Sequence, residues 1–525
     1  MKRTLMVLSC LLLMGGHCKS EDRADARQVS RVEKVNGIQR LLIDGKPTLL
    51  VAGEMRNSSA STDYVLTRDM ATMKSMGLNA VLAPVAWEQL EPEEGQFDFT
   101  LTDRMIALAE EHQMRLVILW FATWKNGESS YMPLWAKQDV KRFFRARDAQ
   151  GFNTTTVSPF CEAAREADAK ALAALMRHVA ERDVTGRVIA VQVENEPGVF
   201  LDIDHSPQSL QLFAKSEELR KHGDTDLARQ HFMAHHYALY MDAVAKAGKA
   251  AYNIPMFVNC WLDEGQPFGK FPNGGPLPIL LDDYKRYAPH IDWLSPDIYS
   301  NDFRGYCQQY CREDNLLFIP ETFADPGRIW YALSEFNAQC VSPFAVETAF
   351  DEPFFTGSLA VLHEVLPQIS EAQGKRIMRG FRRQGNEAGT EFDIDELHFR
   401  VEYIKELPNA FGLVIRTGPQ RLLAAGVGSR IYVSHRDSTK LTRFTNVLDV
   451  KRVGTEWETL FLLNGDQTKH NGCLQLRGRT ENKPAGSIPA PLTDISYSRI
   501  TWEKNKNRLM LPGIYLADFF TIDAK

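Results

Sequence analysis

The sequence lacks the excess of positive charge that a protein binding nucleic acid would need. Its 525 residues include 61 Lys and Arg against 67 Asp and Glu, so the net charge is −6. This balance argues against a polyanion as a partner. Internal repeats and low-complexity linkers are also absent. With 44% hydrophobic and 24% charged residues, the composition is typical of a soluble globular protein, and the length predicts two domains.

Motifs for metals and phosphate-bearing cofactors are missing as well. His205, His235 and His236 show no HExxH or other ligand spacing, and no Gly-rich loop follows the first predicted strand. We therefore expect no metal and no cofactor. The cysteines beyond the N-terminal region are too scattered for a zinc site or a dense disulfide scaffold. Cys307 and Cys311 are close enough in sequence to pair in an oxidising compartment, but buried free thiols are the general expectation.

The N-terminal residues 1–20 are predicted to be an export signal. Lys2 and Arg3 precede a short apolar run, Leu5 to Met14, which is too short for a membrane span. The protein is therefore expected in the periplasm or at the outer membrane or cell surface. Cys18 stands where a lipid-anchored cysteine would stand, although Gly15-Gly16-His17 in front of it fit that interpretation poorly.

One stretch organises the rest of the chain. The β-branched run Val188–Val193 stops abruptly in Asn195-Glu196-Pro197-Gly198, which predicts a buried parallel strand that delivers polar groups to a rim. Because side chains alternate along a strand, Gln192, Glu194 and Glu196 are expected to share one face, which would point inward in a closed barrel. The alternative is that Glu194 and Glu196 form buried ion pairs.

Strand-like and helix-like patterns alternate along the first two thirds of the chain. A turn at Asp44-Gly45 predicts a hairpin that leads into the first strand. Most strand candidates are separated by segments long enough for a crossover helix, which favours a (β/α)8 barrel over residues 32–384, with a doubly wound open sheet as the alternative. The candidates are Thr48–Gly53, Gly77–Pro84, Arg115–Phe121, Val188–Val193, Pro255–Asn259, Asp292–Ile298, Leu316–Pro320 and Val341–Val346.

The character of the sequence changes after a predicted helix at Leu359–Arg382. Short runs such as Phe399–Tyr403, Arg430–Val433 and Thr459–Leu462 are separated by Gly and Asn. Strands at this spacing predict that residues 385–525 form a β-sandwich packed on the barrel. This domain has no paired carboxylate motif, so we expect it to carry no catalytic group.

The predicted strand ends are rich in carboxylates and tryptophans. In a barrel the reactive groups come from the C-terminal ends of the strands. Aromatic faces stack on sugar rings while carboxylates and amides bind sugar hydroxyls, so a carbohydrate is the expected ligand class. The candidate substrate-binding residues at these ends are Glu54, Trp87, Trp124, Lys125, Asn195 and Tyr299.

Two glutamates at strand ends are the candidate catalytic pair. Cleavage of a glycosidic bond needs one carboxyl that protonates the leaving oxygen and a second that attacks the anomeric carbon or activates water. Glu196 and Glu321 each follow an apolar strand, the fourth and the seventh of the series. We expect their carboxyls to be ~5 to 5.5 Å apart, the spacing of a retaining mechanism. The charge of Glu321 and partial burial are expected to raise the pKa of Glu196.

The sequence resembles glycoside hydrolase family 35, the β-galactosidases of clan A, over about residues 35 to 350. The similar segments are Gln192-Val193-Glu194-Asn195-Glu196, Gly77–Val81 running to Trp87, Glu91-Pro92, Gly95–Phe99 and the strand-end Glu321. The layout is similar to the compact bacterial branch with a small C-terminal β-domain. The resemblance implies that Glu196 is the acid/base, that Asn195 holds the sugar 2-hydroxyl and that Glu321 is the nucleophile of a retaining exo-β-galactosidase acting on plant or host glycans.

Two positions depart from the family pattern. Pro84 stands where many members carry tyrosine, and Thr123 stands where they carry glutamate. Both family residues help to recognise galactose, so glucose, L-arabinopyranose and fucose remain alternatives for the sugar. A β-glucosidase or an endo-acting enzyme of the same clan is the alternative within enzymes. A non-catalytic glycan-binding surface protein is the alternative outside them, but a binder has no need for both Glu196 and Glu321.

Overall fold

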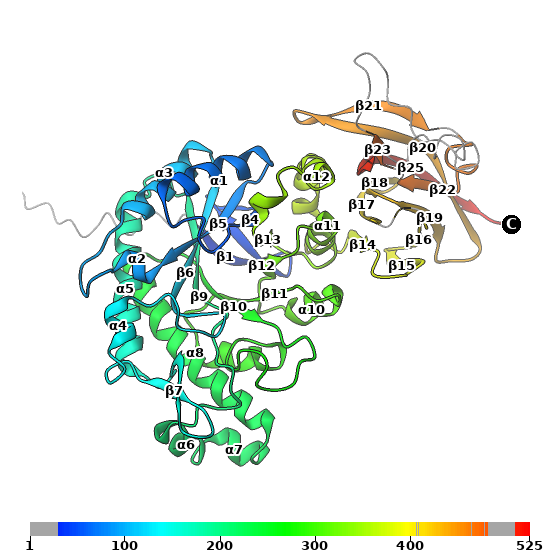
Figure 1. The fold of residues 1–525 in the computed structure, drawn as a ribbon. Helices are drawn as coiled ribbons and strands as arrows, with labels where there is room; N and C mark the ends of the chain where they lie inside the picture. Colours follow the sequence, from blue (N-terminus) through cyan, green and yellow to red (C-terminus); the bar gives the residue numbers. More distant parts are fainter. Residues whose placement is uncertain (1–29, 406, 408, 464, 477, 481–509) are drawn as a thin grey trace, which may run out of the picture.

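The computed structural model describes residues 30–405, 407, 409–463, 465–476, 478–480 and 510–525. The predicted export signal, with Cys18, lies outside them. Eight parallel strands form one sheet in the order β11-β10-β9-β6-β5-β4-β13-β12, and Figure 1 shows it curled into a barrel with helices around it. The strands are β4 (Leu50–Glu54), β5 (Ala80–Ala86), β6 (Arg115–Lys125), β9 (Val188–Asn195), β10 (Met256–Trp261), β11 (Trp293–Asp297), β12 (Phe318–Thr322) and β13 (Cys340–Pro343). All eight predicted strands are present, so the predicted barrel is confirmed.

The barrel closes between β11 and β12. These edge strands meet at one bridge, Ile298 to Thr322, and the Ile298 N–H donates to the Glu321 carbonyl at 2.9 Å. Each of the two strands contains a proline, Pro296 or Pro320. Since proline has no N–H to donate to a ladder, the two residues account for the short closing contact.

Two apolar layers hold the barrel together. Inward-facing residues such as Leu82, Leu119, Phe257 and Trp293 form a buried interior cluster. The predicted turn at Asp44-Gly45 joins β2 (Ile38–Ile43) to β3 (Lys46–Pro47) after β1 (Ser30–Val35). Side chains of β2 belong to the interior cluster, so this small sheet covers that end of the barrel.

The second apolar layer lies between the strands and the helices around them. The helices are α1 (Asp63–Ser75), α2 (Trp87–Leu90), α3 (Thr100–Glu111), α4 (Leu134–Gln138), α5 (Glu162–Arg182), α6 (Pro207–Phe213), α7 (Glu217–His222), α8 (Asp226–Ala251), α9 (Leu281–Tyr287), α10 (Phe303–Tyr310), α11 (Pro326–Glu335) and α12 (Pro353–Ala372). A hairpin of β7 (Arg145–Arg147) and β8 (Asn153–Val157) lies before α5. Within the described residues, no helix is long and apolar enough to cross a membrane.

Two main sheets form the described C-terminal part, as predicted, and a separate two-stranded sheet accompanies them. The first has the order β14-β17-β18-β25-β20-β21 and the second β15-β16-β19-β22. Apolar side chains of both, including Phe399 and Val414, share one core. The strands are β14 (Met378–Arg382), β15 (Gly389–Ile394), β16 (Leu397–Tyr403), β17 (Phe411–Gly418), β18 (Arg421–Val427), β19 (Ser429–His435), β20 (Lys440–Val453), β21 (Glu456–Leu463), β22 (Cys473–Leu476), β23 (Arg479–Thr480), β24 (Met510–Leu511) and β25 (Gly513–Asp523).

The predicted helix Leu359–Arg382 is wrong at its C-terminal end. Helix α12 ends at Ala372, and Met378–Arg382 is strand β14, which pairs with β17. The C-terminal sheets therefore begin ahead of residue 385. Arg379 and Arg382 of this strand form ion pairs of 2.6 Å with Glu335 and Asp325 at the two ends of α11. These basic residues, which resemble a helix C-terminus in sequence, instead attach the sandwich to the barrel.

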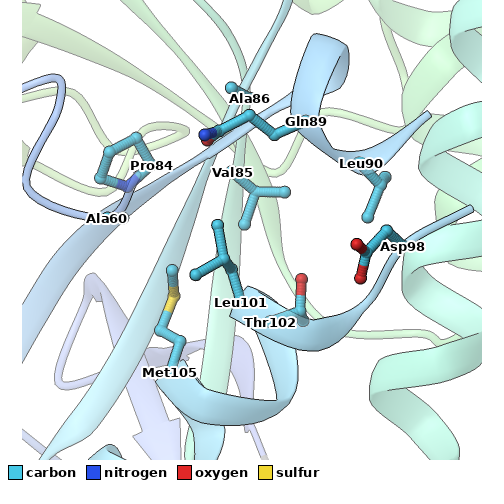
Figure 2. Close-up of a pocket in the computed structure, with 10 residues that line it drawn as sticks. All are labelled: Ala60, Pro84, Val85, Ala86, Gln89, Leu90, Asp98, Leu101, Thr102 and Met105. Carbon is cyan, nitrogen blue, oxygen red and sulfur yellow. The ribbon is translucent and has the colours of Figure 1, made fainter. Parts of the chain in front are cut away.

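A small cavity of about 50 Å³ lies beside β5. Figure 2 shows its lining from β5, α2 and α3, with the Asp98 carboxylate and the Thr102 hydroxyl among apolar side chains. Pro84 is one of its lining residues, whereas neither Glu196 nor Glu321 contributes to it. The cavity is therefore separate from the predicted catalytic pair.

Candidate active site

Polar side chains from six strands converge at the C-terminal end of the barrel. Glu54 ends β4, Lys125 ends β6 and Asn195 ends β9, with Glu196 directly after it. Carboxylate oxygens of Glu196, Asp297 and Glu321 all lie within 4.8 Å of one another. These three side chains are almost completely buried. The predicted pair is thus brought together, at a separation below the ~6.5 to 9.5 Å of inverting enzymes.

A chain of hydrogen bonds leads from Lys125 to Glu321. The Lys125 ammonium donates to Asn195 Oδ1 at 2.9 Å, and Asn195 Nδ2 donates to Glu321 Oε1 at 3.2 Å. The Tyr299 hydroxyl donates to Glu321 Oε2 at 2.9 Å. Both oxygens of Glu321 therefore accept a hydrogen bond, which fixes the orientation of its carboxyl group. Of the predicted binding residues, Lys125, Asn195 and Tyr299 lie in the site.

Glu54 also lies among these residues, but it has no hydrogen bond. It is completely buried, and neither of its carboxyl oxygens has a partner among the described residues. Burial and the nearby charge of Glu321 raise the pKa of Glu54 well above its usual range, against the opposing effect of Lys125. A buried polar group without a partner is costly unless a ligand satisfies it, so Glu54 is available to bind one.

Glu194 does not share the inward face that the sequence predicts for it. Its φ of 62° and that of Glu196, 47°, lie in the left-handed region, which breaks the alternation at the end of β9. Glu194 instead accepts hydrogen bonds from the backbone N–H groups of Thr123 and Trp124, at 3.1 and 2.7 Å. There the register of β6 against β9 shifts between Trp120 and Lys125. Glu194 is therefore a support of this irregularity, which presents Lys125 to the site.

Trp87 and Trp124, both predicted to bind substrate, lie elsewhere. Each is completely buried in the layer between strands and helices. Trp87 donates its indole N–H to Glu91 at 2.7 Å, and Trp124 donates to the Val157 carbonyl at 3.1 Å. Their rings pack against other aromatic rings of this layer. A position near a strand end therefore does not determine whether a side chain faces the site or the helices.

Thr123 faces the helices rather than the sugar site. Its hydroxyl lies 2.8 Å from Asp168 Oδ2 and 2.9 Å from the Tyr240 hydroxyl, on α5 and α8. The position at which the family carries a glutamate therefore serves the support of β6 in this chain.

Burial is the largest influence on the pKa of Glu196. It raises the pKa of Glu196 to about 8, the charge of Glu321 adds to the increase, and Lys125 opposes it. Burial alone would lower the pKa of Lys125, but the carboxylates of Glu321 and Glu196 outweigh that effect and raise it. The site therefore contains a proton-retaining glutamate beside a stable cation.

Two residues were missed as site residues, Asn259 and Asp297. Both lie at the ends of predicted strands, but a single amide or acid at a strand end carries no pattern of its own. Asn259 Oδ1 accepts from the Glu196 N–H at 2.8 Å, and its Nδ2 donates to Asp297 Oδ2 at 2.7 Å. Asn259 thus connects the fourth, fifth and sixth strands of the barrel.

Aromatic side chains near the pair remain partly open to solvent. Phe200, five residues beyond the end of β9, is 37% exposed. Its ring contacts Trp261 edge to face, with 5.9 Å between the ring centroids. Phe323 is 54% exposed and contacts the Tyr299 ring. Such rings are suited to the apolar face of a sugar.

The cysteines of the described residues, Cys307 and Cys311 included, are all free thiols. The general expectation of free thiols therefore holds for this part of the chain.

Comparison with known proteins gives two family matches. The model of glycosyl hydrolases family 35 matches residues 40–249, and a domain of unknown function (DUF5597) matches residues 355–474. A β-galactosidase from Xanthomonas manihotis is 32% identical over 170 residues, which cover 31% of this chain and 26% of the relative. The match thus spans about a quarter of the length of that relative.

The chain also has similarity to solved structures. A β-galactosidase from Rahnella sp. R3 has 16% identity and a TM-score of 0.46, over 63% of this chain and 57% of its own. A β-1,4-D-mannanase from Cryptopygus antarcticus has 12% identity and a TM-score of 0.39, over 60% of this chain and 87% of its own.

The barrel and the paired carboxyls at its fourth and seventh strands form the arrangement that cleavage of a glycosidic bond needs. The match to glycosyl hydrolases family 35 covers residues 40–249, and in part of the chain the sequence is similar to a β-galactosidase. This segment includes Asn195 and Glu196 but ends ahead of Glu321. The assignment of Glu321 therefore rests on the geometry of the site.

The raised pKa of Glu196 predicts a pH-dependent stability. Between its ordinary value of 4.5 and about 8, the folded protein keeps a proton that the unfolded chain has released. The free energy of unfolding should therefore fall as the pH rises through this window. Glu196→Gln, which is neutral at every pH, should be more stable than the wild type by on the order of a few kcal/mol at about pH 9. The difference should vanish below pH 4.5.

Urea unfolding followed by circular dichroism, at both ends of this pH range, measures the difference. Glu181→Gln, at an exposed position of α5, is the matched control and should show none. Equal stability of Glu196→Gln and the wild type at high pH would contradict the raised pKa.

Proposed function

We propose that the protein is an exported, retaining exo-β-glycosidase that removes terminal β-galactosyl residues from plant or host glycans. The observation that carries the proposal is the close approach of the Glu196 and Glu321 carboxyls, within 4.8 Å, at the C-terminal end of the barrel. This spacing leaves too little room for the water of an inverting mechanism and favours direct attack by a carboxylate. The β-galactosidase-like segment 40–249 supports the choice of reaction.

The contacts of the two glutamates support a division of roles. Glu321, which accepts hydrogen bonds from Asn195 and Tyr299, is the nucleophile and attacks the anomeric carbon as an anion. Glu196, whose pKa is raised to about 8 by burial and by Glu321, gives its proton to the departing glycosidic oxygen. When the ester forms, the negative charge of Glu321 disappears and the pKa of Glu196 falls. Glu196 then takes a proton from the water that releases the sugar.

The burial of the site supports action at chain ends. Glu196 and Glu321 are each only 5% exposed, and Glu54 is completely buried. A deeply buried site suits a terminal sugar, whereas an endo-acting enzyme needs an open cleft along which a chain lies. Glu54 and Asn195 offer hydrogen-bonding groups to the hydroxyls of that sugar. The partly exposed Phe200 and Trp261 suit a second sugar on the leaving-group side, because Phe200 follows Glu196 closely in the chain.

The substrate assignment predicts a selective preference among sugars. Aryl β-D-galactoside should be cleaved with a higher kcat/KM than the matching glucoside, fucoside or L-arabinopyranoside, by about tenfold or more, since a misplaced hydroxyl leaves buried polar groups unpaired. Monosaccharide release from galactosylated plant oligosaccharides should accompany it. A preference for glucoside would favour the β-glucosidase alternative, and glycan binding without hydrolysis of any glycoside would favour a binding protein.

The roles of the two glutamates predict different azide products. Glu196→Ala should keep measurable cleavage of substrates whose leaving group needs no protonation, and azide should rescue it as the β-glycosyl azide. Glu321→Ala should lose both steps, and azide should take the place of the nucleophile and give the α-azide. Proton NMR of the products distinguishes the two. Near-normal activity of Glu321→Ala on natural glycans, or exchanged configurations, would refute the assignment.

Export is proposed from the basic and apolar residues at positions 2 to 14. Residues 1–20 act as the signal and direct the protein to the periplasm or the cell surface. In a variant of this proposal, Cys18 carries a lipid anchor. Mass spectrometry of the mature N-terminus should find cleavage near residue 20, or a diacylated Cys18. An intact Met1 in the protein from the native host would overturn export.

A further inference from the structure

Asp297 is a buried acid beside Glu196 to which the reaction, as described above, gives no role. It is the last residue of β11 and is only 2% exposed. Its carboxyl lies within 4.8 Å of the carboxyls of both Glu196 and Glu321. A third carboxyl at this distance from two others adds charge repulsion wherever it is ionised, so its presence calls for an explanation.

Only one oxygen of Asp297 receives a hydrogen bond. Asn259 Nδ2 donates to Oδ2 at 2.7 Å, while Oδ1 is buried and has no donor among the described residues. Asn259 is fixed in this orientation because its own Oδ1 accepts from the Glu196 backbone N–H. An ionised buried carboxylate normally accepts several hydrogen bonds. A neutral carboxylic acid needs a donor on one oxygen only and can itself donate from the other.

The surrounding charges also favour the neutral form. Lys125, the cation among the described groups around Asp297, directs its ammonium at Asn195. Titratable groups from several elements influence Asp297 or are influenced by it. They are Glu54 on β4, Lys125 on β6, Glu196 after β9, Cys260 on β10, Tyr299 after β11, Tyr310 on α10 and Glu321 on β12.

We propose that Asp297 is a positioning residue that remains a neutral acid and donates its Oδ1 proton in a hydrogen bond to the Glu196 carboxyl. The inference rests on the proposed function, since it concerns the acid/base of that reaction. It adds a residue that acts through Glu196 rather than on the substrate.

The hydrogen bond would assist both steps without transferring the Asp297 proton. In the first step the proton of Glu196 moves to the glycosidic oxygen, the bond to the leaving group breaks, and Glu196 becomes an anion. The Asp297 O–H stabilises that anion. In the second step the same anion takes a proton from water while the water oxygen attacks the anomeric carbon and displaces Glu321. Asp297 holds its own proton throughout.

The pKa shifts of Glu196 and Asp297 agree with this arrangement. Burial, followed by the charges of Glu321 and Glu196, raises the pKa of Asp297 well above its usual range. The hydrogen bond with Asp297 opposes the increase in the pKa of Glu196. Asp297 thus allows Glu196 to act as an acid in the first step and as a base in the second.

The test compares Asp297→Asn with Asp297→Ala in the pH profile of kcat/KM, whose alkaline limb reports the loss of the Glu196 proton. Asp297→Asn keeps a neutral side chain with an N–H donor, so its alkaline limb should stay within about 0.3 pH units of the wild type. Asp297→Ala removes the donor and should move the limb upward by about 1 pH unit, because a hydrogen bond to a charged group is lost. Ser295→Ala, two residues earlier on β11, is the control and should leave the limb unchanged.

A downward shift of about 1 pH unit in Asp297→Asn would overturn the proposal, since it would mean that an ionised neighbour had been removed. This outcome does not depend on whether Asp297→Ala folds. A readout without activity is the infrared C=O band of a protonated carboxylic acid at about pH 9, above the pKa of Glu196. The band should be present in the wild type and weaker in Asp297→Asn; equal bands would also overturn the proposal. Wild-type protein that hydrolyses no glycoside would instead refute the proposed function.

Discussion

The burial of several carboxyls around Lys125, the cation that the described residues place among them, is the constraint on which this site depends. Glu196, Asp297 and Glu321 lie together almost without exposure to solvent, Glu54 is buried nearby, and Lys125 is the cation that compensates them. Four ionised carboxyls beside one ammonium would be strongly unfavourable in a medium of low polarity. Some of them must therefore hold protons, and a site that stores protons near neutral pH is suited to acid catalysis.

Lys125 reaches this position because β6 is irregular. The register shift between Trp120 and Lys125 would leave backbone N–H groups unpaired, and the Glu194 carboxylate accepts two of them. Glu194 in turn occupies that place because the backbone at residues 194 and 196 takes a positive φ. Such conformations are costly for residues other than glycine and persist where the surrounding contacts enforce them. The strained backbone at residues 194 and 196 thus has two effects. It places Glu194 where it stabilises β6, and it orients Glu196.

The sequence was sufficient to predict the barrel strands and to select Glu196 and Glu321 as a candidate pair, which the fold brings together, but it did not predict the direction in which each neighbouring side chain points. The strands are short, mostly apolar runs, and Glu196 and Glu321 stand at the ends of two of them, β9 and β12, so position alone selects them as candidates. Trp87 and Trp124 stand at strand ends too, yet they pack among the helices. Side chains stop alternating where β6 shifts its register, and that shift depends on Glu194 of a different strand. The sequence of β6 alone therefore does not show which face a residue beyond the shift occupies. Asp297 was missed because its meaning comes only from Glu196, Asn259 and Glu321 around it.

The same supporting layer explains why Thr123 differs from the glutamate common in the family. Its hydroxyl lies within hydrogen-bonding distance of Asp168 and Tyr240, directly behind the backbone that Glu194 holds. Burial and the proximity of Asp168 already raise the pKa of Glu194. A glutamate at position 123 on this side of the strand would add a third buried carboxyl to that pair, whereas a hydroxyl can donate to it. Thr123 is therefore part of the arrangement that presents Lys125, while Glu54, which is completely buried and unpaired among the described residues, stays available to a ligand.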